Sequence, residues 1–134
     1  MKSVLKNIGI IVVGIIIGMI INMGIIILGA TIFPMTENFE PMNAMNWDLK
    51  YFIFPFLAHA LGTFSGSFAA SRLSKNHHII IPLIVGLYFL SGGIYMATIL
   101  PAPIWFLILD ITLCYIPMAL LGWKLAYIRD GFSA

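Results

Sequence analysis

Charged residues are scarce in this chain. They make up only 9% of its 134 residues, whereas hydrophobic residues make up 61% and the mean hydropathy is +1.05. A soluble domain of this length needs roughly a quarter of its residues charged to cover its surface. The shortage excludes an ordinary soluble domain, and the sequence therefore predicts that most of the protein surface faces lipid.

The chain also has a single cysteine and only a small net positive charge. The single cysteine, Cys114, excludes a disulfide within the chain. The net charge of +2 is too small and too scattered for a nucleic-acid surface, so no nucleic-acid partner is expected. The serines lie outside any G-x-S-x-G context, and Gly92-Gly93 is not a phosphate loop. We therefore expect no enzyme activity and no cofactor.

Four long apolar segments are present, three of them without any charge. A helix needs about 20 predominantly apolar residues to cross a bilayer. The fourth segment reaches that length only if Asp110 lies inside the membrane. The sequence predicts an all-α polytopic membrane protein, a single domain over residues 1–134. Its four transmembrane helices are expected at about 7–33, 49–72, 79–99 and 104–127.

The basic residues are distributed unequally between the two sides of this arrangement. One side holds Lys2, Lys6, Arg72, Lys75, Lys124 and Arg129. Lys50 alone falls on the other side. Cytoplasmic loops carry the excess of Lys and Arg. Both termini and the 72–78 turn are therefore predicted to be cytoplasmic, and the 34–48 loop is predicted to lie outside.

Each predicted helix carries a stripe of small or polar residues at spacings of three or four, which places them on one face. The stripes contain, helix by helix, Gly14, Gly18 and Asn22; His59, Gly62 and Gly66; Ser91 and Tyr95; and Asp110 and Cys114. Small residues let membrane helices approach closely. The four glycines are therefore predicted to pack helices inside the bundle, with packing between protomers of a homo-oligomer as the alternative.

His59 and Asp110 are the two ionisable groups predicted at membrane depth that could form an ion pair. At 1.5 Å per residue they lie about 12 Å and 9 Å below the outer membrane edge. A charged group facing lipid costs at least a few kcal/mol, so each should find a partner. The two side chains are predicted to touch, directly or through one water. A polar layer in the outer half of the bundle would contain Asn22, His59, Ser91, Tyr95, Asp110 and Cys114.

Three interpretations of this polar layer remain open. In the first, it fixes the helix register of a structural or accessory component of a larger membrane complex. The alternative is a small transporter or channel-like subunit in which His59 and Asp110 couple to a proton or cation. The third, a zinc site that adds Cys114, lacks a second histidine or cysteine at that depth, so no bound metal is expected. A water-filled cavity reaching His59 from outside favours transport, whereas a dry, packed bundle favours the structural interpretation.

Four segments together carry a resemblance to a known group of proteins. They are INMGIIILG at 21–29, FPFLAHALGT at 54–63, LPAPIWFLILD at 100–110 and YIPMALLG at 115–122. Over about residues 8–126 the chain resembles an uncharacterised family of small four-helix bacterial membrane proteins. The resemblance implies a multi-pass protein of the inner membrane. It marks Asn22, His59, Pro101, Pro103 and Asp110, and it implies no activity.

Overall fold

The computed structural model describes residues 1–75 and 78–132, with side chains described as far as residue 128; residues 76–77 of the predicted 72–78 turn lie outside this part. The elements are α1 (Lys2–Ile32), a 3-10 helix (Ala44–Asn46), α2 (Lys50–Ser74), α3 (Ile80–Ile99), α4 (Ile104–Leu113) and α5 (Ile116–Phe132). Four segments of the described chain are long and apolar enough to cross a membrane, namely Lys2–Ile32, Lys50–Ser74, Ile80–Ile99 and Ile104–Ile128. The predicted all-α class with four possible membrane spans is therefore confirmed.

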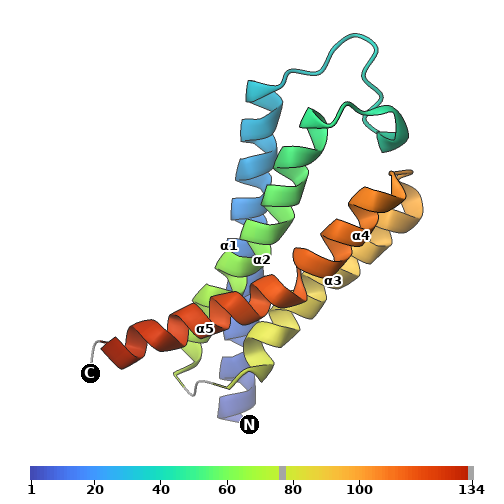
Figure 1. Cartoon of the computed structure of the whole chain (residues 1–134). Helices are drawn as coiled ribbons and strands as arrows, with labels where there is room; N and C mark the ends of the chain where they lie inside the picture. Colours follow the sequence, from blue (N-terminus) through green and yellow to red (C-terminus); the bar gives the residue numbers. More distant parts are fainter. Residues whose placement is uncertain (76–77, 133–134) are drawn as a thin grey trace.

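Helices α1 and α2 lie side by side and share the most extensive helix contact of the described chain (Figure 1). Glycines make this close approach possible. A Cβ atom at Gly66 would lie 2.5 Å from the carbonyl oxygen of Gly14, and one at Gly62 would lie 2.9 Å from that of Gly18. Both distances are shorter than real Cβ contacts. The four glycines that the sequence marks for packing thus meet within one chain, at the α1–α2 interface.

Helices α3 and α4 lean away from the α1–α2 pair toward the upper end of the molecule (Figure 1). At the lower end the two helix pairs are joined through α5, which contacts both α2 and α3. Glycines again set the distance there. A Cβ atom at Gly86 would lie 2.6 Å from that of Ala119, and one at Gly122 would lie 2.7 Å from the carbonyl oxygen of Phe64. The bundle is therefore tight at the end that holds both termini and splayed at the other.

The structure divides the predicted helix 104–127 into α4 and α5. Pro117 has no N–H group, and its ring crowds the carbonyl of Leu113, which favours a kink or break of the helix at this point. The amide of Cys114 still donates to the carbonyl of Asp110 at 3.0 Å, and the amide of Ala119 donates to that of Tyr115 at 2.8 Å. The chain is thus helical on both sides of a bend at residues 114–115.

The loop after α1 bridges the splayed end of the bundle. Its 3-10 helix lies between the upper ends of α2 and α3 (Figure 1). The amide of Ala44 donates to the carbonyl of Pro101 at 2.8 Å, and Ala44 is buried against Phe52 and Phe106. The indole N–H of Trp47 donates to the carbonyl of Glu40 at 2.8 Å. The two upper loops are therefore tied to each other and close the top of the space between the helices.

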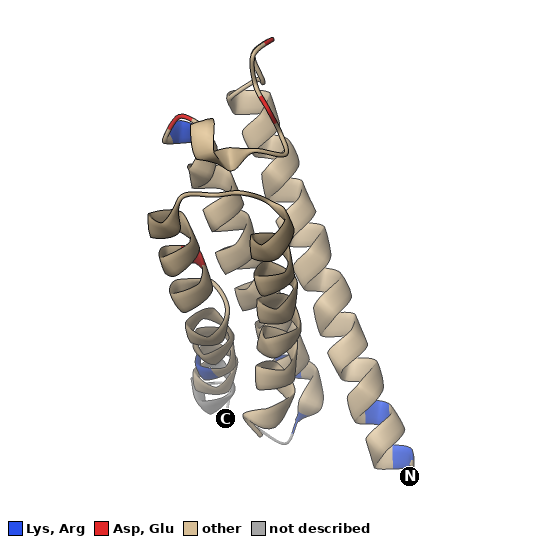
Figure 2. Ribbon diagram, turned by 90° about the vertical axis from the view of Figure 1, so that its right-hand side faces the viewer, with Lys and Arg blue, Asp and Glu red and all other residues tan. Residues whose placement is uncertain are grey.

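Charged residues gather at the two ends of the molecule (Figure 2). The lysines and arginines lie mostly at the end that holds both termini, whereas the acidic residues lie mostly on the loop at the opposite end. One acidic residue lies part-way along α4, and the only acidic residue of that helix is Asp110. The helices between the two ends are otherwise uncharged, as a membrane span requires.

Candidate functional site

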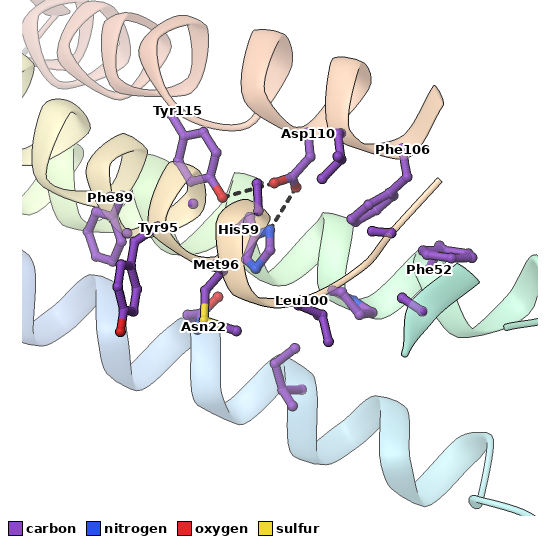
Figure 3. A pocket seen from close by; sticks show the side chains of 18 of the residues that line it. Asn22, Phe52, His59, Phe89, Tyr95, Met96, Leu100, Phe106, Asp110 and Tyr115 are labelled. Atoms are coloured by element: carbon purple, nitrogen blue, oxygen red, sulfur yellow. Dashed lines mark hydrogen bonds and ion pairs between the residues drawn. The ribbon is translucent and has the colours of Figure 1, made fainter. Parts of the chain in front are cut away.

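The predicted contact between His59 and Asp110 is present and direct. His59 Nδ1 lies 2.7 Å from Asp110 Oδ1, which joins the middle of α2 to α4 (Figure 3). The carboxyl side chain is 6% exposed and the imidazole 30% exposed. When Asp110 is ionised it only accepts hydrogen bonds, and Nδ1 then carries the shared hydrogen. Asp110 is thereby shielded within the protein, while the imidazole presents its other side to the space between the helices.

Tyr115 is the second partner of the carboxylate. Its hydroxyl donates to Asp110 Oδ2 at 3.0 Å, and its ring stacks on that of His59 with 5.9 Å between centroids. Tyr115 is fully buried. Both carboxylate oxygens therefore have a hydrogen-bond donor, and the site consists of three residues, His59, Asp110 and Tyr115. Such a satisfied arrangement lowers the cost of keeping a charge at this depth.

Sequence reasoning missed Tyr115 because it assumed one regular helix. On such a helix, a residue five positions after Asp110 lies about 140° around the axis, on a different face. The bend before Pro117 interrupts that geometry. Gly93 also leaves room for Tyr115, because a Cβ atom at position 93 would collide with the tyrosine hydroxyl. The signals present in the sequence were Pro117 and the Gly92-Gly93 pair on the facing helix.

A cavity of about 600 Å³ lies beside the His59–Asp110 pair, in the splayed half of the bundle (Figure 3). Helices α1 to α4 and the upper loops all contribute to its wall. Cavities of about 300–1,000 Å³ with mostly apolar walls and a few polar groups are typical ligand sites. Five residues of the predicted polar layer line it, namely Asn22, His59, Ser91, Tyr95 and Asp110. The structure thus gathers them around an open space instead of a closed hydrogen-bonded layer.

The remaining members of the predicted layer differ in their surroundings. The Ser91 hydroxyl donates to the backbone carbonyl of Tyr88 at 2.7 Å. Tyr95 is 63% exposed. Cys114 is fully buried and its Sγ lies 3.5 Å from the carbonyl oxygen of Phe56. It is not among the residues that line the cavity. Within the described side chains, no three His, Cys, Asp or Glu residues are grouped closely enough to hold a metal ion.

Two polar groups in the cavity wall have unused hydrogen-bonding capacity. Within the side chains described here, His59 Nε2 and the Asn22 amide have no hydrogen-bond partner. Figure 3 shows both side chains directed into the same space. Nε2 accepts a hydrogen bond when the imidazole is neutral and donates one when it is protonated, whereas an amide does both. The wall can therefore bind a polar group or a proton without first breaking the His59–Asp110–Tyr115 contacts.

Comparisons of this chain with protein-family models, with curated proteins and with solved structures found no match. The family resemblance stated above therefore remains an expectation. The structure itself supports the coarser description, because it shows four helical segments that could span a membrane and a buried ion pair between two of them. This chain is a small four-span membrane protein with a buried His59–Asp110 salt bridge.

Proposed function

We propose that the protein is a small carrier, alone or as a subunit of a larger membrane assembly, that exchanges a proton for a ligand at the His59–Asp110 pair. The observation that supports this proposal is the cavity of about 600 Å³ that reaches the pair in the splayed half of the bundle. A dry, fully packed bundle would have favoured a purely structural role. The proposal includes no catalytic step.

The proton step follows from how the imidazole is held. Asp110 fixes Nδ1 as the nitrogen that carries hydrogen, so Nε2 is left as the proton acceptor on the cavity side. When Nε2 is free, the pair carries one negative charge. When Nε2 binds a proton, the pair becomes neutral. The charge at the cavity wall therefore changes by one unit with each proton, and a bound ligand responds to that change.

The orientation of the protein is part of the proposal. We propose that both termini are cytoplasmic, as the gathering of basic residues at that end of the molecule supports (Figure 2). In a bacterium, the membrane concerned is the inner membrane. The cavity then lies in the outer half of the bilayer, since it is on the side of the acidic loop. A ligand would reach it from the outer leaflet or the outside.

Cysteine labelling tests this orientation. Met42, on the upper loop, is 65% exposed, and Ser3 is exposed near the amino terminus. In a Cys114→Ala background, Met42→Cys is expected to react with a membrane-impermeant maleimide in intact cells. Ser3→Cys is expected to react only after permeabilisation. Labelling of Ser3→Cys in intact cells would contradict the orientation, and the Cys114→Ala parent without added cysteine measures the background.

Proton movement in proteoliposomes tests the carrier function. With a pH gradient imposed and a trapped pH dye, one class of added solute, cationic, anionic or neutral, is expected to accelerate the collapse of the gradient. His59→Leu removes the proton acceptor and should reduce this solute-driven rate by about tenfold or more, a transition-state difference of about 1.4 kcal/mol. His78→Leu, at an exposed residue outside the cavity wall, is the matched control. Unchanged solute-driven flux in folded His59→Leu would contradict the proposal.

A second candidate is the structural role, which one observation favours. Both oxygens of Asp110 are already bonded, so the site ties α2, α4 and the bend before α5 together without any ligand. Interhelical hydrogen bonds in membranes contribute about 0.6–2 kcal/mol each. If this is the whole role, no solute class moves protons through the wild-type protein, and only its stability depends on the pair.

A further inference from the structure

We infer, on the basis of the proposed carrier function, that the ligand is a lipophilic cation that enters the cavity sideways from the bilayer, between α1 and α3. Its positive charge comes to rest beside the His59–Asp110 pair. Three features of the cavity support this inference, namely its charge, its aromatic wall and the position of its opening.

The charge of the cavity favours a cation. Among the described residues that line it, Asp110 is the one acidic residue, and there is no lysine or arginine. With Nε2 of His59 unprotonated, the site carries one uncompensated negative charge. In a wall of low dielectric constant that charge acts over a longer range than in water. An anionic ligand would be repelled by this charge, and a neutral ligand would be attracted to it less strongly than a cation.

The wall offers the right surfaces for an organic cation. The aromatic lining residues include Trp47, Phe52, Phe89, Tyr95, Phe106 and Tyr115. Aromatic faces attract cations within about 6 Å of the ring centroid, and the effect grows when both partners are removed from water. The oxygens of Asp110 are already bonded to His59 and Tyr115. The cation would therefore be held by the charge of the pair and by aromatic faces, without a direct salt bridge.

The opening of the cavity lies toward lipid. The hydrogen bond between Ala44 and Pro101 ties the loops over its upper end. At its lower end Phe89 packs against Gly18, where a Cβ atom would lie 2.6 Å from the ring. Among the lining residues, Met19 of α1 is 51% exposed and Tyr95 of α3 is 63% exposed, whereas Asn22 and Ile26 of α1 are partly buried. A ligand that dissolves in the bilayer can thus enter directly, whereas a strongly hydrated ion cannot.

Proton and cation would compete for the same negative charge. Protonation of Nε2 makes the pair neutral and removes the attraction for a bound cation. Binding of the cation makes protonation of Nε2 unfavourable for the same electrostatic reason. One cation and one proton therefore exclude each other at this site, which supplies the exchange that the carrier function requires.

Binding of tetraphenylphosphonium in lipid nanodiscs tests the charge preference. Calorimetry should detect binding above that of empty nanodiscs, at least about tenfold tighter than binding of tetraphenylborate, an anion of nearly the same size and shape. Asp110→Asn keeps the side-chain shape but removes the charge, and it should weaken tetraphenylphosphonium binding by about tenfold or more. Asp48→Asn, at an acidic residue that does not line the cavity, is the matched control.

A second pair of variants tests the site and its opening without touching the ion pair. Gly92 lines the cavity, and a Cβ atom there has no neighbour within 4 Å, so Gly92→Phe should fill the opening without disturbing the fold. It should weaken or slow tetraphenylphosphonium binding. Gly24 on α1 is equally open but does not line the cavity. Gly24→Phe should bind the cation as the wild type does.

The outcomes separate this inference from the carrier proposal. Equal affinity for the two ions, no binding above empty nanodiscs, or wild-type affinity in both Asp110→Asn and Gly92→Phe would overturn the inference. The carrier proposal would then stand if another solute class drives proton movement that depends on His59. Conversely, cation binding that requires Asp110, without solute-driven proton movement, supports the ligand class and overturns the exchange step.

Discussion

Gly14→Leu is expected to lower the free energy of unfolding by roughly 3 kcal/mol, at the upper end of the usual cost of overpacking. The first added carbon would lie 2.8 Å from the carbonyl oxygen of Gly66 and 2.9 Å from the Cβ atom of Ala70. A backbone oxygen inside a helix cannot move aside on its own, so α1 and α2 must separate. Unfolding in mixed micelles of increasing denaturing detergent, followed by circular dichroism, measures the loss.

The control for this variant lies on the same helix. Gly24 has no atom within 4 Å of the position a Cβ atom would take, so Gly24→Leu should change stability by no more than about 0.5 kcal/mol. The particle mass from light scattering adds a second measurement. A Gly14→Leu variant that is as stable as the wild type and only converts a dimer to a monomer would contradict packing within the chain. That outcome would show that the glycines pack protomers together.

His59→Leu and Asp110→Leu are each expected to cost roughly 1–3 kcal/mol of unfolding free energy, because each leaves a buried polar partner unsatisfied. The aspartate variant should cost more, since it releases the hydroxyl of Tyr115 as well as the imidazole. The double variant should cost about 1 kcal/mol or more less than the sum of the single variants, as residues in direct contact require. The same detergent titration measures all three.

This double-mutant cycle of His59 and Asp110 has a matched control in the same protein. Asp48 lies on the upper loop and is not bonded to His59, so the cost of His59→Leu with Asp48→Leu should equal the sum of the two single costs within about 0.5 kcal/mol. Additivity in the His59–Asp110 cycle as well would contradict an energetic link between the pair. A stable double variant that has lost solute-driven proton movement would favour the carrier over the structural role.

The sequence by itself determined the number of spans and the pairing of the two ionisable residues. Both follow from one constraint, because lipid accepts neither unpaired backbone groups nor unpaired charges. Long uncharged segments therefore had to be helices. His59 and Asp110, on different helices at similar depth, had no other ion-pair partner at that depth. The small residues at Gly14, Gly18, Gly62 and Gly66 likewise marked the faces where α1 and α2 meet.

The third member of the site and the cavity were decided only by the tertiary structure. A pattern of small and polar residues shows which face of a helix turns inward, but not how far apart two inward faces lie. That separation depends on the bend before Pro117, on the tight glycine contacts at the lower end and on the loop bridge from Ala44 to Pro101. Together these features turn Tyr115 toward Asp110 and leave the upper half of the bundle open. Pro117 marks the position of the bend locally, but the splay of the helices arises from contacts among residues far apart in the chain, so no local pattern specified the cavity.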